Sequence, residues 1–139
     1  MRAVLQRVTR AAVQFEGETV SRIGPGLLVL LGVGHADTEE TAQRMAEKIR
    51  ALRIFSDADG RMNDALGERE ILCVSQFTLY ADTSRGNRPS FTQAAAPEHA
   101  SRLYERVCEL LAAERGRFGA AMELDLINDG PVTIVLEVT

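Results

Sequence analysis

The sequence has few of the features that mark membrane, secreted or disulfide-rich proteins. Its longest apolar run, within Gly26–Val33, is far too short to cross a bilayer. Only two cysteines are present, Cys73 and Cys108, and both lie in apolar stretches. We therefore expect buried, reduced thiols rather than a disulfide. The first residues enter a strand-like pattern at once and show no signal peptide. Together these observations predict a soluble cytoplasmic protein with no membrane partner.

An excess of positive charge is also missing. The 16 basic and 20 acidic residues give a formal net charge of −4. Proteins that hold long nucleic acids through the phosphate backbone usually carry a basic surface, so we expect no DNA partner. Any contact with RNA should be local, at an end of the RNA or in a pocket with arginines of its own.

What is present is typical of one globular domain. The 139 residues are 45% hydrophobic and 26% charged, which suffices for a core of ordinary size. No repeat, low-complexity tract or interdomain linker interrupts the chain. We expect a single domain over residues 1–139.

Apolar periodicity predicts a mixed α/β fold with two main helices. The expected order is a hairpin, a strand, a helix, two strands, a helix and two strands, with the sheet either open or curled into a barrel-like dimer core. Asp37 and Thr38 are both candidate N-caps of the first helix. The expected ranges are strands at 1–15, 19–23, 27–33, 53–55, 71–79, 122–127 and 132–138, helices at 38–52 and 97–113, a polar loop at 56–67 and a long irregular segment at 80–96.

A Gly-Pro pair separates the last two predicted strands, in Asn128-Asp129-Gly130-Pro131-Val132-Thr133. Proline donates no backbone hydrogen bond and is normally confined to edges, bulges and turns. Glycine lets another molecule approach the main chain closely, and an X-Pro bond is where a cis peptide is least unfavourable. A plain hairpin connection and a functional element both fit this stretch.

Polar side chains end the strand predicted at 71–79, in Ser75-Gln76-Phe77-Thr78-Leu79. Polar groups in this position must find partners or face a cavity. Ser75 or Thr78 would need an activating base to act as a nucleophile. The chain has no Gly-x-Ser-x-Gly elbow and no histidine close in sequence, so strand-end hydrogen bonding and a ligand pocket both fit.

Two segments combine arginine with an aromatic residue, 84–91 and 115–119. Arginine forks suit phosphate and aromatic rings suit stacked bases, so these segments are candidates for a local RNA contact. His35 and His99 lack metal-ligand spacing and are predicted to be surface residues. Asp57-Ala58-Asp59-Gly60 lacks a complete calcium-loop pattern and is predicted to be a polar turn. We expect no metal and no cofactor.

Taken together, these motifs have the order and spacing of a known family. The combination of Ser75-Gln76-Phe77-Thr78-Leu79 with Asn128-x-Gly130-Pro131-x-Thr133 closely resembles D-aminoacyl-tRNA deacylase, the D-tyrosyl-tRNA(Tyr) deacylase family. The resemblance covers the whole chain without departure at the motif positions. It includes residues 1–8, Gly86-Asn87-Arg88-Pro89-x-Phe91 and Gly116-x-Phe118-Gly119-Ala120-x-Met122.

The resemblance implies a homodimeric enzyme that hydrolyses the ester between a D-amino acid, or achiral glycine, and the 3′-terminal adenosine of tRNA. In the family a cis Gly-Pro peptide reaches into the partner's pocket, where its carbonyl oxygens collide with an L side chain. Gly130 and Pro131 match that pair, with Asn128 and Thr133 beside them, and Arg7 matches the arginine that holds the carbonyls. Exclusion of this kind needs no recognition of a particular side chain.

The same resemblance makes Thr78 a nucleophile candidate, with Ser75, Gln76 and Phe77 shaping the adenosine and ester pocket. Phe77 indicates the D-specific branch, because a sister family with relaxed chirality carries alanine there. A second route, in which the terminal 2′-hydroxyl assists and backbone N–H groups stabilise the oxyanion, is favoured because no general base accompanies Thr78. Phe118, Met122 and Ala94 are expected to line the pocket. A non-catalytic module that binds the 3′ end of aminoacylated RNA is the alternative.

Overall fold

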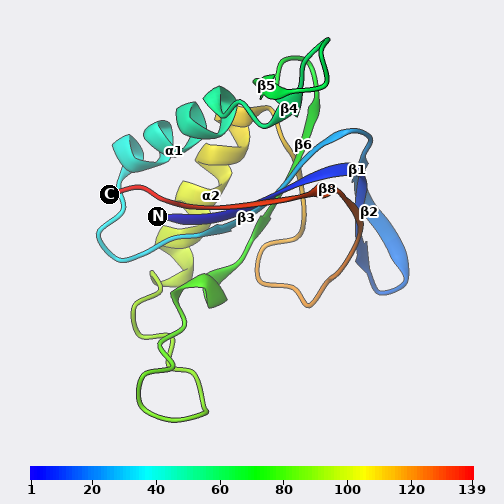
Figure 1. Ribbon diagram of the computed structural model, residues 1–139. Coiled ribbons are helices and arrows are strands. Elements are labelled where there is room, and N and C mark those ends of the chain that lie inside the picture. Colours follow the sequence, from blue (N-terminus) through cyan, green and yellow to red (C-terminus); the bar gives the residue numbers. More distant parts are fainter.

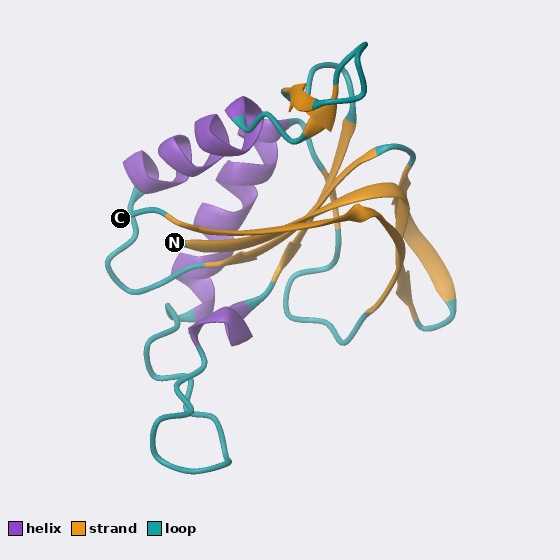
Figure 2. Ribbon diagram, viewed as in Figure 1, coloured by secondary structure: helices purple, strands orange, loops and turns teal.

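The computed structural model describes residues 1–139 as a strongly bent mixed sheet with two helices on one face (Figures 1 and 2). The long strand β1 lies at its centre and pairs antiparallel with β2, β3 and β8. β6 then runs parallel to β3, and β7 parallel to β6. The strands are β1 (Arg2–Phe15), β2 (Glu18–Ile23), β3 (Gly26–Gly32), β4 (Phe55–Ser56), β5 (Met62–Asp64), β6 (Glu70–Ser75), β7 (Glu114–Arg115) and β8 (Glu123–Glu137).

The sheet curls until its two ends meet. Ser21 on β2 donates a hydrogen bond from its hydroxyl to the carbonyl of Arg115 on β7, at 2.7 Å. This contact joins the first and last strands of the order β2-β1-β3-β6-β7. The predicted α/β class, with two helices and a barrel-like sheet, is confirmed.

Two apolar clusters fill the two sides of the curled sheet. The larger lies between the sheet and the helices and includes Leu27, Val29 and Leu31 of β3. The smaller lies inside the curl and includes Leu28 of the same strand. β3 is thus buried on both faces, as its continuous apolar run predicted.

Both helices bury the face that the sequence periodicity predicted. α1 (Glu39–Ala51) begins at Thr38, which forms a capping box with Thr41, and buries Met45 and Ile49. α2 (Pro97–Leu111) buries residues at the same spacing and ends at Ala112 in the left-handed conformation, φ 50°. The predicted cap at Asp37 was wrong: this carboxylate is buried and bonded elsewhere.

Three short elements differ from the prediction. The strand predicted at 71–79 ends at Ser75, and Phe77–Tyr80 forms a 3-10 helix, η1. The strand predicted at 53–55 is β4, shifted to Phe55–Ser56, and the loop predicted at 56–67 contains β5, which pairs with it. β7 was missed because two paired residues leave no periodic pattern. Each miss concerns an element of four residues or fewer, for which tertiary contacts outweigh local preference.

The pair of strands predicted at the C-terminal end is a single strand, β8, which follows β1 along nearly its whole length. Gln6 pairs with Thr133 and Val8 pairs with Asn128, so residues 129–132 form a wide bulge opposite one β1 residue. The Gly130-Pro131 peptide bond within this bulge is cis. The hairpin interpretation of this stretch is therefore wrong, because both halves pair with the same partner strand.

The two ends of the chain lie side by side (Figure 1). The N–H of Val138 donates to the carbonyl of Met1 at 2.9 Å. None of the helices has the length and apolar character needed to cross a membrane.

Candidate active site

A cavity of about 720 Å³ opens where β3 and β6 end. Because the two strands are parallel neighbours, their carboxyl ends meet at one edge of the sheet. The start of α2 and the segment after β7 complete the walls. The lining is mostly apolar and comprises Val33, His35, Val74, Ser75, Gln76, Phe77, Phe91, Ala94, Ala95, Ala96, Pro97, Ala100, Phe118, Gly119, Ala120, Ala121, Met122 and Leu124.

The floor of the cavity is formed where β6 turns into η1. The N–H of Gln76 still donates to Leu31 of β3, at 2.7 Å, and the next residues leave the sheet. Gly32 makes room for this turn, since a Cβ there would lie 3.0 Å from the carbonyl oxygen of Gln76. The N–H groups of Phe77 and Thr78 take part in no hydrogen bond. Two adjacent backbone donors are therefore available beside the cavity.

Two aromatic rings meet at the mouth of the cavity. Phe77 and Phe91 contact edge to face, with ring centroids 5.0 Å apart and planes at 71°. Both remain unusually exposed for phenylalanine, at 55% and 37%. Exposed aromatic rings beside a concave site are suited to stacking against a nucleobase.

Thr78 lies just outside the lining of this cavity. The amide of Gln76 donates a hydrogen bond to its hydroxyl oxygen. No histidine, carboxylate or amine lies within hydrogen-bonding distance of that hydroxyl. A hydroxyl nucleophile needs such a base, so the geometry gives Thr78 no means of activation.

Arg2 contacts the carboxyl end of η1. Its Nη1 donates to the carbonyl of Leu79 at 3.0 Å, and its guanidinium lies 4.5 Å from the ring centroid of Tyr80. Its Nε lies 3.7 Å from a carboxylate oxygen of Glu137 on β8. A cation at the last carbonyls of a helix is favourable. Arg2 thereby fixes the short helix whose first two N–H groups are unpaired.

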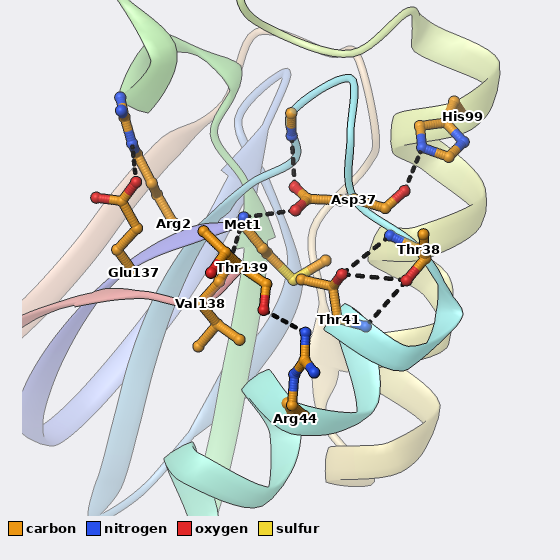
Figure 3. A network of polar contacts seen from close by, with 11 residues as sticks. Met1, Arg2, Asp37, Thr38, Thr41, Arg44, His99, Glu137, Val138 and Thr139 are labelled. Atoms are coloured by element: carbon orange, nitrogen blue, oxygen red, sulfur yellow. Dashed lines mark hydrogen bonds and ion pairs between the residues drawn. The ribbon is translucent and has the colours of Figure 1, made fainter.

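A buried carboxylate fixes the wall formed by the segment after β3 (Figure 3). Asp37 accepts the α-ammonium of Met1 on Oδ1 and the N–H of Gly34 on Oδ2, each at 2.7 Å. The ring Nε2 of His99 lies 2.8 Å from the carbonyl of Asp37. A buried carboxylate is stable only with such partners, and here they join the N-terminus, β3 and α2.

The bulge at Gly130 lies away from this cavity. Arg7 on β1 donates from Nε to the carbonyl of Asp129 at 3.3 Å and from Nη1 to the carbonyl of Ile54 at 2.7 Å. Asn128 donates from its amide to the carbonyls of Arg7 and Val132. The bulge is therefore fixed by side chains, while Gly130 and the residue after it are exposed.

A sequence profile of D-Tyr-tRNA(Tyr) deacylase matches residues 4–137. This chain belongs to the D-Tyr-tRNA(Tyr) deacylase family. Two curated proteins named D-aminoacyl-tRNA deacylase, from Dehalococcoides mccartyi and Myxococcus xanthus, are each 56% identical to it over 144 residues, which covers 99% of this chain and 94% of theirs. The family resemblance found in the sequence motifs is confirmed.

Two solved structures are similar to this deacylase-family chain. One, titled c-Myc DNA Unwinding Element Binding Protein, has a TM-score of 0.93 and 44% identity and covers 99% of this chain and 98% of its own. The other is titled as a probable eukaryotic D-amino acid tRNA deacylase, with a TM-score of 0.85, 19% identity and 97% coverage of both chains. At that identity the second match supports the fold alone.

The cavity of this deacylase-family chain brings together part of the residue set predicted from the motifs. Ser75, Gln76 and Phe77 meet Ala94, Phe118 and Met122 from three distant segments. The side chain of Met122 is fixed there by the N–H of Arg117, 3.1 Å from its sulfur. The residues that lie outside the lining are Thr78, Arg7, Asn128, Gly130, Pro131 and Thr133.

His35 and Phe91 line the cavity and were not among the residues predicted to form the pocket, although Phe91 ends a segment predicted to contact RNA. His35 is exposed, as expected of a surface histidine, but its Nε2 lies 2.6 Å from the carbonyl of Thr92 and joins two walls of the cavity. His35 could have been predicted from its place just after β3, because the carboxyl ends of neighbouring parallel strands lie at the same edge of a sheet. The motif indicated Phe91, and its contact with Phe77 places it at the cavity mouth.

The two cysteines are free and buried behind this site, as predicted. The hydroxyl of Tyr104 donates to the carbonyl of Cys73 at 2.8 Å. The contact with Cys108 and burial raise the pKa of the Cys73 thiol. A buried thiol with a raised pKa is inert, so Cys73 belongs to the core. No cluster of three or more metal-binding side chains is present.

Proposed function

We propose that this protein hydrolyses the ester bond between a D-amino acid and the 3′-terminal adenosine of a tRNA. The observation that carries the proposal is the cavity in which the family's Ser75-Gln76-Phe77 stretch meets Phe118 and Met122. Free D-amino acid and reusable tRNA are the products. Charged tRNA would be met in the cytoplasm, by a single-domain enzyme that needs no cofactor.

The terminal adenosine would lie against the exposed faces of the Phe77 and Phe91 rings, which offer an aromatic surface for the base. Stacking on aromatic side chains contributes about 1–3 kcal/mol per base. The apolar walls would then surround the aminoacyl group. Because no charged side chain lines the cavity, binding would depend little on the identity of the D-amino acid.

The reaction would proceed by attack of water on the ester carbonyl. The N–H groups of Phe77 and Thr78 would stabilise the oxyanion, which is commonly the largest electrostatic contribution in acyl transfer. The 2′-hydroxyl of the terminal ribose would position the water and relay its proton to the departing 3′ oxygen. The ester C–O bond breaks, the carboxylate takes the hydroxyl of water and the ribose takes the proton. This route suits a site in which Thr78 lacks a base.

Chiral selection would come from Gly130 and Pro131 of a second copy of the chain. Both residues are exposed, and both lie outside the cavity of their own protomer. Their carbonyl oxygens would enter the partner's cavity and occupy the space that an L side chain needs. Glycine has no side chain, so glycyl-tRNA would also be accepted. The free outer edge of β8, with Val135 75% exposed, is a suitable interface for such a homodimer.

The decisive experiment compares D-tyrosyl-tRNA and L-tyrosyl-tRNA as substrates of the purified protein in the presence of a chelator. We expect rapid release of D-tyrosine and no release of L-tyrosine above the spontaneous rate. Equal cleavage of both esters would contradict the chiral mechanism and leave an unselective esterase. Binding of charged tRNA without cleavage of either ester would establish the non-catalytic module instead.

A further inference from the structure

A loop, residues 82–90, projects from the end of the molecule that contains η1 (Figure 1). Its base is closed by two backbone hydrogen bonds between Asp82 and Ser90, at 2.8 and 2.9 Å. Residues 83–90 are all exposed, and Gly86 at the tip has a φ of 113°, which side chains rarely permit. The loop is therefore closed at its base, which we call the neck, and its tip lies in solvent.

The loop carries two positive charges that no group of the protein neutralises. Arg85 and Arg88 take part in no ion pair, side-chain hydrogen bond or ring contact. The only acidic residue at the neck, Asp82, accepts the N–H of Ser84 at 2.9 Å, and these contacts with Ser84 lower the pKa of its carboxyl. One loop therefore carries two unpaired guanidinium groups, on a chain of net charge −4.

The second arginine-containing segment does not share this property. Arg115 lies 3.4 Å from a carboxylate oxygen of Glu105. Arg117 lies over the ring of Phe15, 4.6 Å from its centroid. Of the two segments that the sequence indicated as candidates for an RNA contact, only the loop at 82–90 has free arginines.

The loop is continuous with both sides of the cavity mouth. Before it, the N–H of Ala81 donates to the carbonyl of Thr78 at 3.0 Å. After it comes Phe91, which contacts Phe77 at the mouth, and then Ala95, whose N–H donates to Val33 at 2.9 Å. A strand of RNA whose last nucleotide occupied the cavity would leave it beside this loop.

We propose that Arg85 and Arg88 bind backbone phosphates of the nucleotides that precede the terminal adenosine of the substrate RNA. This inference rests on the proposed function and names the part of the tRNA that the loop contacts. Guanidinium forks match phosphate oxygens in pairs. The contact reads no base, so it would serve every tRNA that ends in the same single strand.

The expected signature is a dependence on salt. Each phosphate contact with single-stranded nucleic acid contributes about −0.7 to the slope of log affinity against log salt concentration. Loss of two contacts should make the slope of log(kcat/KM) less negative by about 1.4. At low salt we expect a variant without the two arginines to have a kcat/KM for charged tRNA roughly tenfold or more below that of the wild type. A fold-change of this size is typical of lost hydrogen bonds to charged groups.

The test compares R85Q/R88Q with the matched control R22Q/R61Q. The control removes two further unpaired, exposed arginines that do not line the cavity. Each protein is assayed with D-tyrosyl-tRNA over a range of salt concentrations and with 3′-O-D-tyrosyl-adenosine, which has no phosphate. We expect the salt slope to become less negative in R85Q/R88Q but not in the control, and the loss of kcat/KM to be confined to the tRNA substrate.

Three results would overturn this inference. Equal changes in both double variants would indicate long-range charge effects, and an equal deficit on the adenosine ester would indicate a structural role of the loop. Unchanged kinetics would exclude the contact altogether. If the wild-type protein cleaved neither ester, the proposed function would fail separately. Fluorescence anisotropy with charged tRNA would then decide whether R85Q/R88Q binds more weakly than the control.

Discussion

Replacement of Arg2 by methionine should both destabilise the protein and slow the reaction. Methionine keeps an unbranched apolar stem and removes the guanidinium. The variant would lose the hydrogen bond to Leu79 at 3.0 Å, the contact with the ring of Tyr80 at 4.5 Å and the ion pair with Glu137 at 3.7 Å.

These contacts set the expected magnitude. A half-buried hydrogen bond from a charged donor contributes about 1.5–3 kcal/mol. A partly exposed cation–π contact adds about 0.5–1 kcal/mol, and an exposed ion pair about 0–1 kcal/mol. Because contributions of neighbours are not additive, we expect a loss of about 2–4 kcal/mol, which at a urea m-value of ~2 kcal/mol/M is a midpoint shift of ~1–2 M.

The matched control is Arg10→Met. Arg10 lies on the same strand and forms a similar exposed ion pair with Asp125 of β8, at 3.2 Å, but does not contact η1. Its loss should lower stability by at most about 1 kcal/mol. Urea unfolding followed by circular dichroism measures both variants.

The kinetic expectation separates the two roles of Arg2. A looser η1 would misplace the N–H groups of Phe77 and Thr78, so kcat for D-tyrosyl-tRNA should fall about tenfold or more, with a smaller effect on KM. Arg2→Lys should recover part of the rate, because it restores the charge and one donor. If Arg2→Met were no less stable than Arg10→Met and equally active, Arg2 would not hold η1.

Three further outcomes follow from the contacts described. Gly130→Ala should destabilise the protein by about 1–3 kcal/mol, because φ is 119° there and the new Cβ would lie 2.8 Å from Nη2 of Arg7. Gly17→Ala is the control for backbone strain alone, because φ is 80° there and no atom lies within 4 Å of the new Cβ. Equal urea midpoints for Gly130→Ala and Gly17→Ala would refute the clash with Arg7. Thr78→Ala should lower kcat less than tenfold, whereas a substrate ending in 2′-deoxyadenosine should react at least ~100-fold more slowly. The reverse order in single-turnover assays would restore Thr78 as the nucleophile. Burial and the charge of Asp37 raise the pKa of Tyr80 to about 12. Since the neutral phenol is favoured in the folded state, this stability is fully present below the unfolded pKa of about 10 and is lost as pH rises through 12. Ionisation of a tyrosine at pH 10 in the folded protein, detected by ultraviolet absorbance, would contradict this assignment.

The longer elements of the fold were predictable because their patterns are strong. β3 is a continuous apolar run covered on both faces, and α1 combines a capping residue with apolar positions three and four apart. β8 was not predictable as one strand, because no local rule places a Gly-Pro inside a strand. Only pairing with β1 on both sides of the bulge makes it continuous.

The cavity was predictable in part for a similar reason. Polar residues at the end of β6 indicated a site, and the motifs added Phe118 and Met122. His35, Phe91 and the support from Arg2 depend on the meeting of distant segments, which no single stretch encodes. Likewise, only side-chain contacts show that Arg115 is paired while Arg85 is free.

The two stretches that violate local rules are both held by arginines of β1. Arg2 fixes the turn at the end of β6 through the carbonyl of Leu79, and Arg7 fixes the bulge through the carbonyl of Asp129. In both cases the guanidinium bonds to main chain, so it fixes the position of the backbone. Backbone N–H groups at η1 and backbone carbonyls at the bulge are also the groups that the proposed mechanism uses for catalysis and for chiral exclusion. A reaction carried out by main-chain groups needs side chains mainly as supports. In such a reaction the cavity lining can be apolar, and Arg2 and Arg7 both lie outside it.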